Sequence, residues 1–78
     1  MKAKVEYTDT FGGDANYSWC ERYSFDCTGM TDLAITRKAK KLCNLNGVRG
    51  KANVIGDMLE FRPFGMCTIM FITFNDHE

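Results

Sequence analysis

Four cysteines are the side chains best suited to metal or redox chemistry, and their spacing argues against both. They stand at positions 20, 27, 43 and 67, and no two have the Cys-x-x-Cys spacing by which one turn offers two thiolates to zinc. The chain opens Met-Lys-Ala-Lys-Val-Glu, without the apolar stretch of a signal peptide. We therefore expect four reduced thiols in a cytosolic protein, rather than a disulfide framework, a metal site or a cofactor.

Side chains for catalysis are equally poorly placed. A nucleophile needs an adjacent base, and the single histidine, His77, is the penultimate residue. Gly12-Gly13 is followed by no Lys-Ser/Thr pair, so it does not form a phosphate-binding loop. Carboxylates are plentiful, but spacing in the sequence does not identify a catalytic pair among Asp9, Asp14, Glu21, Asp26, Asp57 and Glu60. We predict that the protein is not an enzyme and has no catalytic residues.

The distribution of charge carries more information than its total. Ten basic residues balance ten acidic ones over 78 residues, which excludes a histone-like polycation and an all-acidic DNA mimic. Residues 1–36 carry a net charge of −3, residues 37–51 carry +6 without any acid, and residues 52–78 carry −3. The protein is therefore neutral but electrically polar.

The basic segment is the candidate partner-binding site. It comprises Arg37, Lys38, Lys40, Lys41, Arg49 and Lys51. On a helix, Arg37, Lys40 and Lys41 span an arc of roughly 100° opposite the apolar residues. Such a ridge suits a phosphate backbone or an acidic protein surface. The alternative is a solvated helix face whose cations interact favourably with the helix dipole.

Periodicity predicts the elements that position this ridge. Strands are expected over residues 3–8, 16–26, 51–55, 58–62 and 66–74, and a helix over 31–45. Thr31 is the expected helix cap, Ile35, Ala39 and Leu42 form an apolar stripe, and Gly47 is the expected left-handed stop. No apolar run reaches the roughly 18 residues of a membrane span.

These elements predict one compact α+β domain over residues 1–78. Its order is β-β-α-β-β-β, a mostly antiparallel sheet with one helix packed on a face. Residues 66–74 are apolar on both faces and should form the central strand. Glu21 interrupts an apolar face, so we expect a bulge, a basic partner such as Arg62, or a position beyond the core.

Aromatic residues and methionines are abundant, and we expect most of them in the core. Tyr17 and Trp19 share an apolar face with Tyr23 and Phe25 in the second predicted strand. A sheet covered by one helix has a second face, where four residues could form a partly exposed protein-binding patch. These residues are Met58, Phe64, Met66 and Met70.

Three segments carry a resemblance to a known group. They are residues 9–19 (DTFGGDANYSW), 37–49 (RKAKKLCNLNGVR) and 61–74 (FRPFGMCTIMFITF). Together they resemble small phage- and prophage-encoded proteins associated with inhibition of type I CRISPR surveillance (Cascade) complexes. The resemblance implies an anti-CRISPR protein in the host bacterial cytoplasm that binds subunits of this complex and blocks target DNA binding.

Two other functions fit the same residues. A nucleic-acid-binding module would place the basic ridge directly on phosphates, and its binding would weaken steeply with salt. A phage accessory or assembly protein would self-associate through methionine-rich faces. We expect no membrane partner, and a monomer or weak homodimer in solution.

Overall fold

The computed structural model describes residues 1–75, so His77 lies outside the described residues. The observed elements follow the predicted order. They are β1 (Lys2–Phe11), β2 (Asp14–Asp26), α1 (Asp32–Leu42), β3 (Gly50–Ile55), β4 (Met58–Pro63) and β5 (Thr68–Asn75). Within residues 1–75, no helix is long and apolar enough to cross a membrane.

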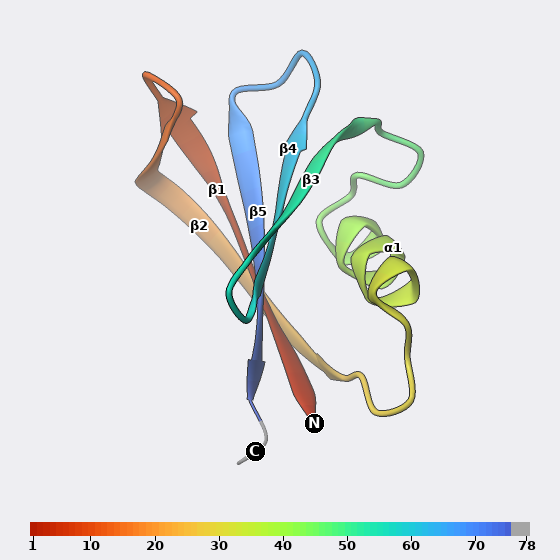
Figure 1. Ribbon diagram of the computed structural model, residues 1–78. Coiled ribbons are helices and arrows are strands. Elements are labelled where there is room, and N and C mark those ends of the chain that lie inside the picture. Colours follow the sequence, from red (N-terminus) through yellow and green to blue (C-terminus); the bar gives the residue numbers. More distant parts are fainter. Residues whose placement is uncertain (76–78) are drawn as a thin grey trace.

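The five strands form one antiparallel sheet in the order β2-β1-β5-β4-β3. The predicted central strand is confirmed, because β5 lies between β1 and β4. Its apolar residues are buried on both faces: Ile69 is 1% exposed and Met70 is 0% exposed. Figure 1 shows the two hairpins β1–β2 and β3–β4 on either side of this strand.

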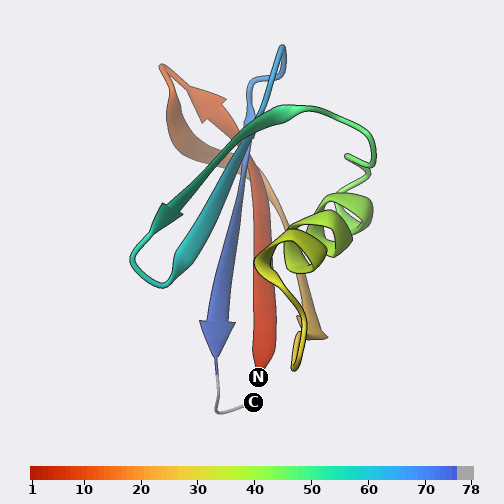
Figure 2. The same cartoon turned by 45° about the vertical axis from the view of Figure 1, so that its right-hand side comes forward.

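Helix α1 covers one face of the sheet (Figures 1 and 2). Directly paired residues share a face in an antiparallel sheet. Val5 is paired with Tyr23 on one side and with Ile72 on the other. The row continues into β4, where Leu59 is paired with Ile72. This apolar row packs with Ile35 of α1 in a single core cluster.

The start of α1 is as predicted, whereas its end is not. Thr31 caps the helix by accepting a hydrogen bond from the backbone N–H of Ala34 at 3.1 Å. The helix ends at Leu42 rather than at residue 45. Asn44, not Gly47, supplies the left-handed residue at this end, with a φ of 60°. The N–H of Leu45 then donates to the carbonyl of Lys40 at 2.7 Å, which closes a Schellman-type turn.

The early stop also changes the apolar stripe. Ile35 and Ala39 are buried as predicted, at 4% and 0% exposure, but Leu42 is 38% exposed. Cys43 and Leu45 take its place in the core, at 5% and 2% exposure. The Schellman-type turn causes this exchange, because it directs Leu45 back over the sheet after the helix has ended.

Glu21 lies beyond the core. It is exposed at the outer strand, where the hydroxyl of Tyr23 donates a 2.7 Å hydrogen bond to its carboxylate. This bond to a charged acceptor raises the pKa of Tyr23. Arg62 is not the partner of Glu21, because its Nε donates to Glu60 at 3.0 Å.

Burial predicts different reactivities for the four thiols. Cys27 and Cys43 are buried and Cys67 is exposed. Burial raises the pKa of the Cys43 thiol to about 12, because it disfavours the thiolate that reacts. We expect a thiol reagent at neutral pH to label Cys67 first and Cys43 only on unfolding. Mass spectrometry of the labelled chain measures this order, and native labelling of Cys43 at the rate of Cys67 would contradict it.

The pairing of β3 with β4 depends on Gly50. A Cβ at this position would lie 2.7 Å from Cζ of Phe61 and 2.8 Å from Cα of Pro63. We expect Gly50→Ala to lower the free energy of unfolding in urea by about 1–3 kcal/mol, because this contact cannot relax without separating the strands. Ser24→Ala, at an exposed position, is the control and should change it by less than about 0.5 kcal/mol. Equal effects would show that the close approach is not limiting.

Candidate partner-binding surfaces

The predicted cations of α1 divide into two outward-facing and two flanking residues. Ile35 and Ala39 hold one side of the helix against the sheet. Arg37 and Lys41 are exposed on the helix; we call these two residues the outer helix surface. Among the described residues, neither takes part in any of the ion pairs.

Lys38 and Lys40 extend across the sheet in opposite directions. The Lys38 ammonium lies 5.0 Å from the ring centroid of Phe25 on β2. That of Lys40 lies 4.8 Å from the ring centroid of Phe61 on β4. Both side chains place an alkyl chain along apolar surface and a cation over an aromatic ring. These two lysines are therefore partly engaged within the fold.

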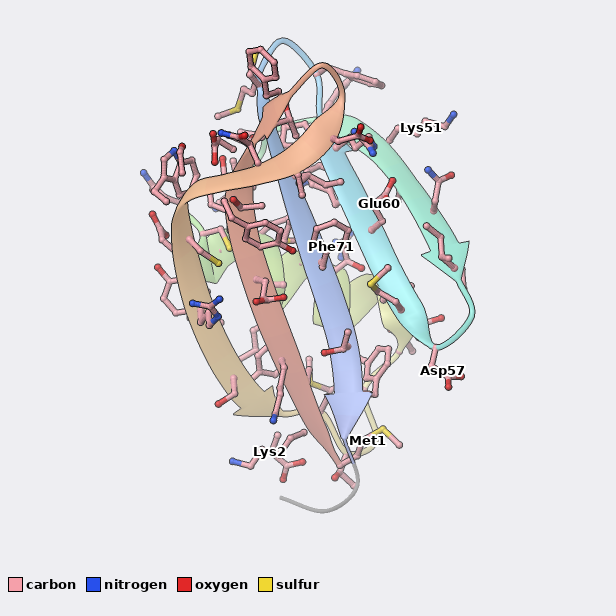
Figure 3. All side chains as sticks on the ribbon, turned by 90° about the vertical axis from the view of Figure 1, so that its left-hand side faces the viewer. Met1, Lys2, Lys51, Asp57, Glu60 and Phe71 are labelled. Atoms are coloured by element: carbon pink, nitrogen blue, oxygen red, sulfur yellow. The ribbon has the colours of Figure 1, made fainter. Side chains whose placement is uncertain are left out.

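The remaining two predicted cations belong to other parts of the surface. Arg49 lies in the connection to β3, and its carbonyl accepts a hydrogen bond from the N–H of Phe64 at 2.9 Å. Lys51 is paired with Arg62 of β4, on the sheet face away from α1, where Figure 3 shows it at the edge. The fold thus separates the six predicted residues, and only Arg37 and Lys41 form the outer helix surface.

The β1–β2 hairpin is organised by one carboxylate. Asp9 accepts hydrogen bonds from Nδ2 of Asn16 at 2.9 Å and from the Ser18 backbone N–H at 2.9 Å and hydroxyl at 2.6 Å. The hydroxyl of Thr8 lies 3.2 Å from the same carboxylate. These bonds stabilise the ionised carboxylate of Asp9, and the bond from the Ser18 hydroxyl contributes most. They therefore hold the pKa of Asp9 well below its ordinary value of 3.8. They account for three polar residues of the segment DTFGGDANYS, namely Asp9, Asn16 and Ser18.

This network holds Tyr17 in an unusual backbone conformation. Its φ is 56°, in the left-handed region that side chains other than glycine seldom adopt. Thr8 compensates, because its buried hydroxyl accepts from the Tyr17 N–H at 3.1 Å and donates to the carbonyl of Trp19 at 2.8 Å. The Trp19 ring then packs edge-on against Tyr7, with centroids 5.2 Å apart.

Tyr17 and Trp19 do not lie in the core, where most aromatic residues are expected: Tyr17 lies at the bend, and Trp19 is only partly covered by its contact with Tyr7. Tyr17 is 51% and Trp19 is 41% exposed. The bend follows from side-chain hydrogen bonds across the hairpin, which strand periodicity does not register.

A second loop meets the hairpin at the same end of the sheet. Nη1 of Arg62 donates to the carbonyl of Gly13 at 2.7 Å, and the N–H of Thr10 donates to that of Cys67 at 2.9 Å. Large apolar side chains are exposed on both loops; we call this set the aromatic end. Its members are Phe11, Tyr17, Trp19, Phe64 and Met66.

The predicted apolar patch is only partly present. Phe64 and Met66 are exposed, at 67% and 44%. Met70 is completely buried, because it is paired with Tyr7 and Phe61 on the helix-covered face. Met58 is half-buried at the turn between β3 and β4, at the opposite end of the strands from Phe64. These four residues therefore do not form one surface.

An open cleft of about 690 Å³ lies between the start of α1 and the β3–β4 turn. Met30, Ile35, Leu59 and Phe74 contribute apolar walls, and Asp32 and Asp57 lie at its rim. Within residues 1–75, no group of three His, Cys, Asp or Glu side chains is arranged to hold a metal ion.

Comparison with known proteins gave no match. No protein-family model matches the chain, and neither a curated protein nor a solved structure shows significant similarity to it.

The low pKa of Asp9 makes a prediction about stability and pH. A carboxylate whose pKa is depressed in the folded state stabilises the fold fully above its ordinary pKa of 3.8, and this contribution decreases as the pH falls below that value towards the lower folded-state pKa. We expect Asp9→Asn to destabilise the protein more at neutral pH than at about pH 3.

Urea unfolding of both proteins at the two pH values tests this expectation. Asp14→Asn, at the start of β2 in the same hairpin, is the control for the loss of a charge and should change the free energy of unfolding by less than about 0.5 kcal/mol. The wild type and Asp9→Asn differ in their free energy of unfolding. If this difference stays constant or grows between neutral pH and about pH 3, ionised Asp9 does not stabilise the fold.

Proposed function

We propose that the protein acts by binding, as an inhibitor that docks on a type I CRISPR surveillance complex in the bacterial host and blocks its access to target DNA. The resemblance of residues 9–19, 37–49 and 61–74 supports this class of partner. The outer helix surface supports an electrostatic contact with an acidic partner, and it is the main observation behind the proposal. A binder of this kind needs a rigid surface and no catalytic group.

The helix presents its cations in a fixed geometry. Thr31 caps one end of α1, the turn at Asn44 closes the other, and Ala39 is completely buried between them. Arg37 and Lys41 are four residues apart, so they lie on neighbouring turns of the same side. A partner meets two ordered cations without having to order the helix first.

The alternative contact, through acidic strands, is less available. Glu6 and Glu60 are paired with Arg22 and Arg62, respectively. Asp9 is occupied by its hairpin, and Asp26 accepts from Thr28 and lies 3.9 Å from the N-terminal ammonium. An engaged carboxylate must give up its internal bonds before it binds a basic partner. The cationic helix is therefore the better docking surface for acidic protein or exposed RNA phosphate.

Charge reversal of the outer helix surface tests the proposal. The double variant Arg37→Glu/Lys41→Glu should need at least a tenfold higher concentration to prevent a type I complex from shifting labelled target DNA in a gel. Loss of both cations and gain of two anions repels the acidic partner surface. Both residues are exposed, so circular dichroism should show an unchanged fold.

Lys2→Glu is the matched control, because Lys2 lies at the start of β1, next to the edge strand β2, and not on the helix (Figure 3). It should inhibit like the unaltered protein. Equal inhibition by the double variant would exclude the outer helix surface. A shift of DNA by this protein alone, weakening steeply with salt, would favour a nucleic-acid-binding module. Absence of any effect on the complex would favour a phage accessory protein.

A further inference from the structure

Strand β3 is a free edge of the sheet. It pairs with β4 on one side, and the strand order ends there. The opposite edge, β2, carries Glu21, Arg22 and Asp26, whereas β3 has one charged residue, Lys51. Charges along an edge prevent pairing with another chain, so β3 is the less protected of the two.

The turn at the end of β3 determines which backbone groups are free. Ile55 and Met58 flank a two-residue turn in which Gly56 has a φ of 58°, and they form the closing pair. Alternate residues of an antiparallel strand direct their N–H and C=O groups to opposite sides. Ile55 is therefore bonded to β4, and the backbone groups of Gly50, Ala52 and Val54 face outward.

The side chains along this edge are apolar and exposed. Val54 is 70% and Ile55 is 51% exposed. A groove of about 290 Å³ runs beside the edge, between β3 and α1, and is lined by Leu33, Val54 and Leu59 among others. Leu33 is itself 61% exposed. The free backbone row is thus accompanied by an apolar surface that a neighbouring strand would cover.

We propose that two copies of this chain pair through their β3 edges, antiparallel, about a two-fold axis at Val54. This register places Val54 against Val54 of the second copy, on the helix-covered face. It also brings Lys51 beside the β3–β4 turn of the second copy, which carries Asp57, and the symmetry repeats this approach of opposite charges. Figure 3 shows both residues on the β3 side of the sheet.

Charge complementarity favours this register over its neighbours. A two-fold axis at Ala52 would place Lys51 opposite Asn53. An axis at Asn53 would place the ammonium of Lys51 against Ile55 and an amide against itself. The chosen register alone combines a β-branched pair at the centre with Lys51 beside the turn that carries Asp57 at both ends. Self-pairing uses the β3 edge of each copy. No β3 edge then remains to recruit a third copy, so the assembly closes as a dimer.

Both helices lie on the same face of the joined sheet, because the two-fold axis is perpendicular to it. The dimer therefore presents two outer helix surfaces in one direction. This inference stands on the β3 edge alone and does not depend on which partner the helices bind.

Sedimentation velocity from micromolar to millimolar protein tests the proposal. The chain should pass from monomer to dimer, and Val54→Pro should raise the dimer dissociation constant at least tenfold. Proline removes an N–H that faces away from β4, so the sheet of the monomer is retained. Val54→Lys is a second variant with the same expectation, and circular dichroism verifies the fold of both.

Charge exchange tests the register. Lys51→Asp and Asp57→Lys should each weaken the dimer at least threefold, and the double variant should restore it. Within one chain Lys51 lies near the start of β3, whereas Asp57 lies in the turn that follows the other end of this strand, so restoration requires the second copy. A wild-type monomer at millimolar concentration, a dimer unaffected by Val54→Pro, or a double variant that is not restored would each overturn the proposal.

Discussion

One short helix has to cover a five-stranded sheet, and most features of the surface follow from this constraint. Five strands spaced about 4.8 Å apart span about 19 Å, nearly twice the width of a helix. Ala39, completely buried, lets α1 approach the middle of the sheet closely. Lys38 and Lys40 extend the cover on either side, over Phe25 and Phe61. The cover does not reach β3, and an open groove remains there.

The same constraint determines which charges are available to a partner. Lysines that help to cover the sheet are partly engaged with aromatic rings, whereas Arg37 and Lys41 lie on the uncovered side of the helix. The carboxylates of the strands show the opposite behaviour, since Glu6, Asp9 and Glu60 bind groups within the molecule. A chain with no net charge thus engages these three acids within the molecule and leaves Arg37 and Lys41 of the helix outside the ion pairs of the described residues, where they can make an electrostatic contact.

The hairpin at the other end of the sheet shows how a distinctive sequence can have a structural role. Asp9, Asn16 and Ser18 form a hydrogen-bonded turn, and Thr8 stabilises the left-handed backbone of Tyr17. Energy stored in such a conformation persists only where the surroundings hold it, and here it turns an aromatic ring outward. The hydrogen bonds of Thr8, Asp9, Asn16 and Ser18 therefore fix the backbone of this hairpin. The exposed rings that the hairpin contributes to the aromatic end project from that backbone.

Local pattern in the sequence was sufficient for the elements, their order and the central position of β5, because side-chain period and turn residues act over a few neighbouring positions. It also identified the Thr31 cap and the buried Ile35 and Ala39. It grouped Tyr17 with the aromatic residues expected mostly in the core, and Arg37 with Lys51 in one ridge, and the observed positions of Tyr17 and Lys51 have a non-local origin. The orientation of Tyr17 depends on hydrogen bonds across the hairpin, and the position of Lys51 depends on its pairing with β4. Which residues share a surface was decided by tertiary structure, because strand register and helix placement are set by contacts between distant segments.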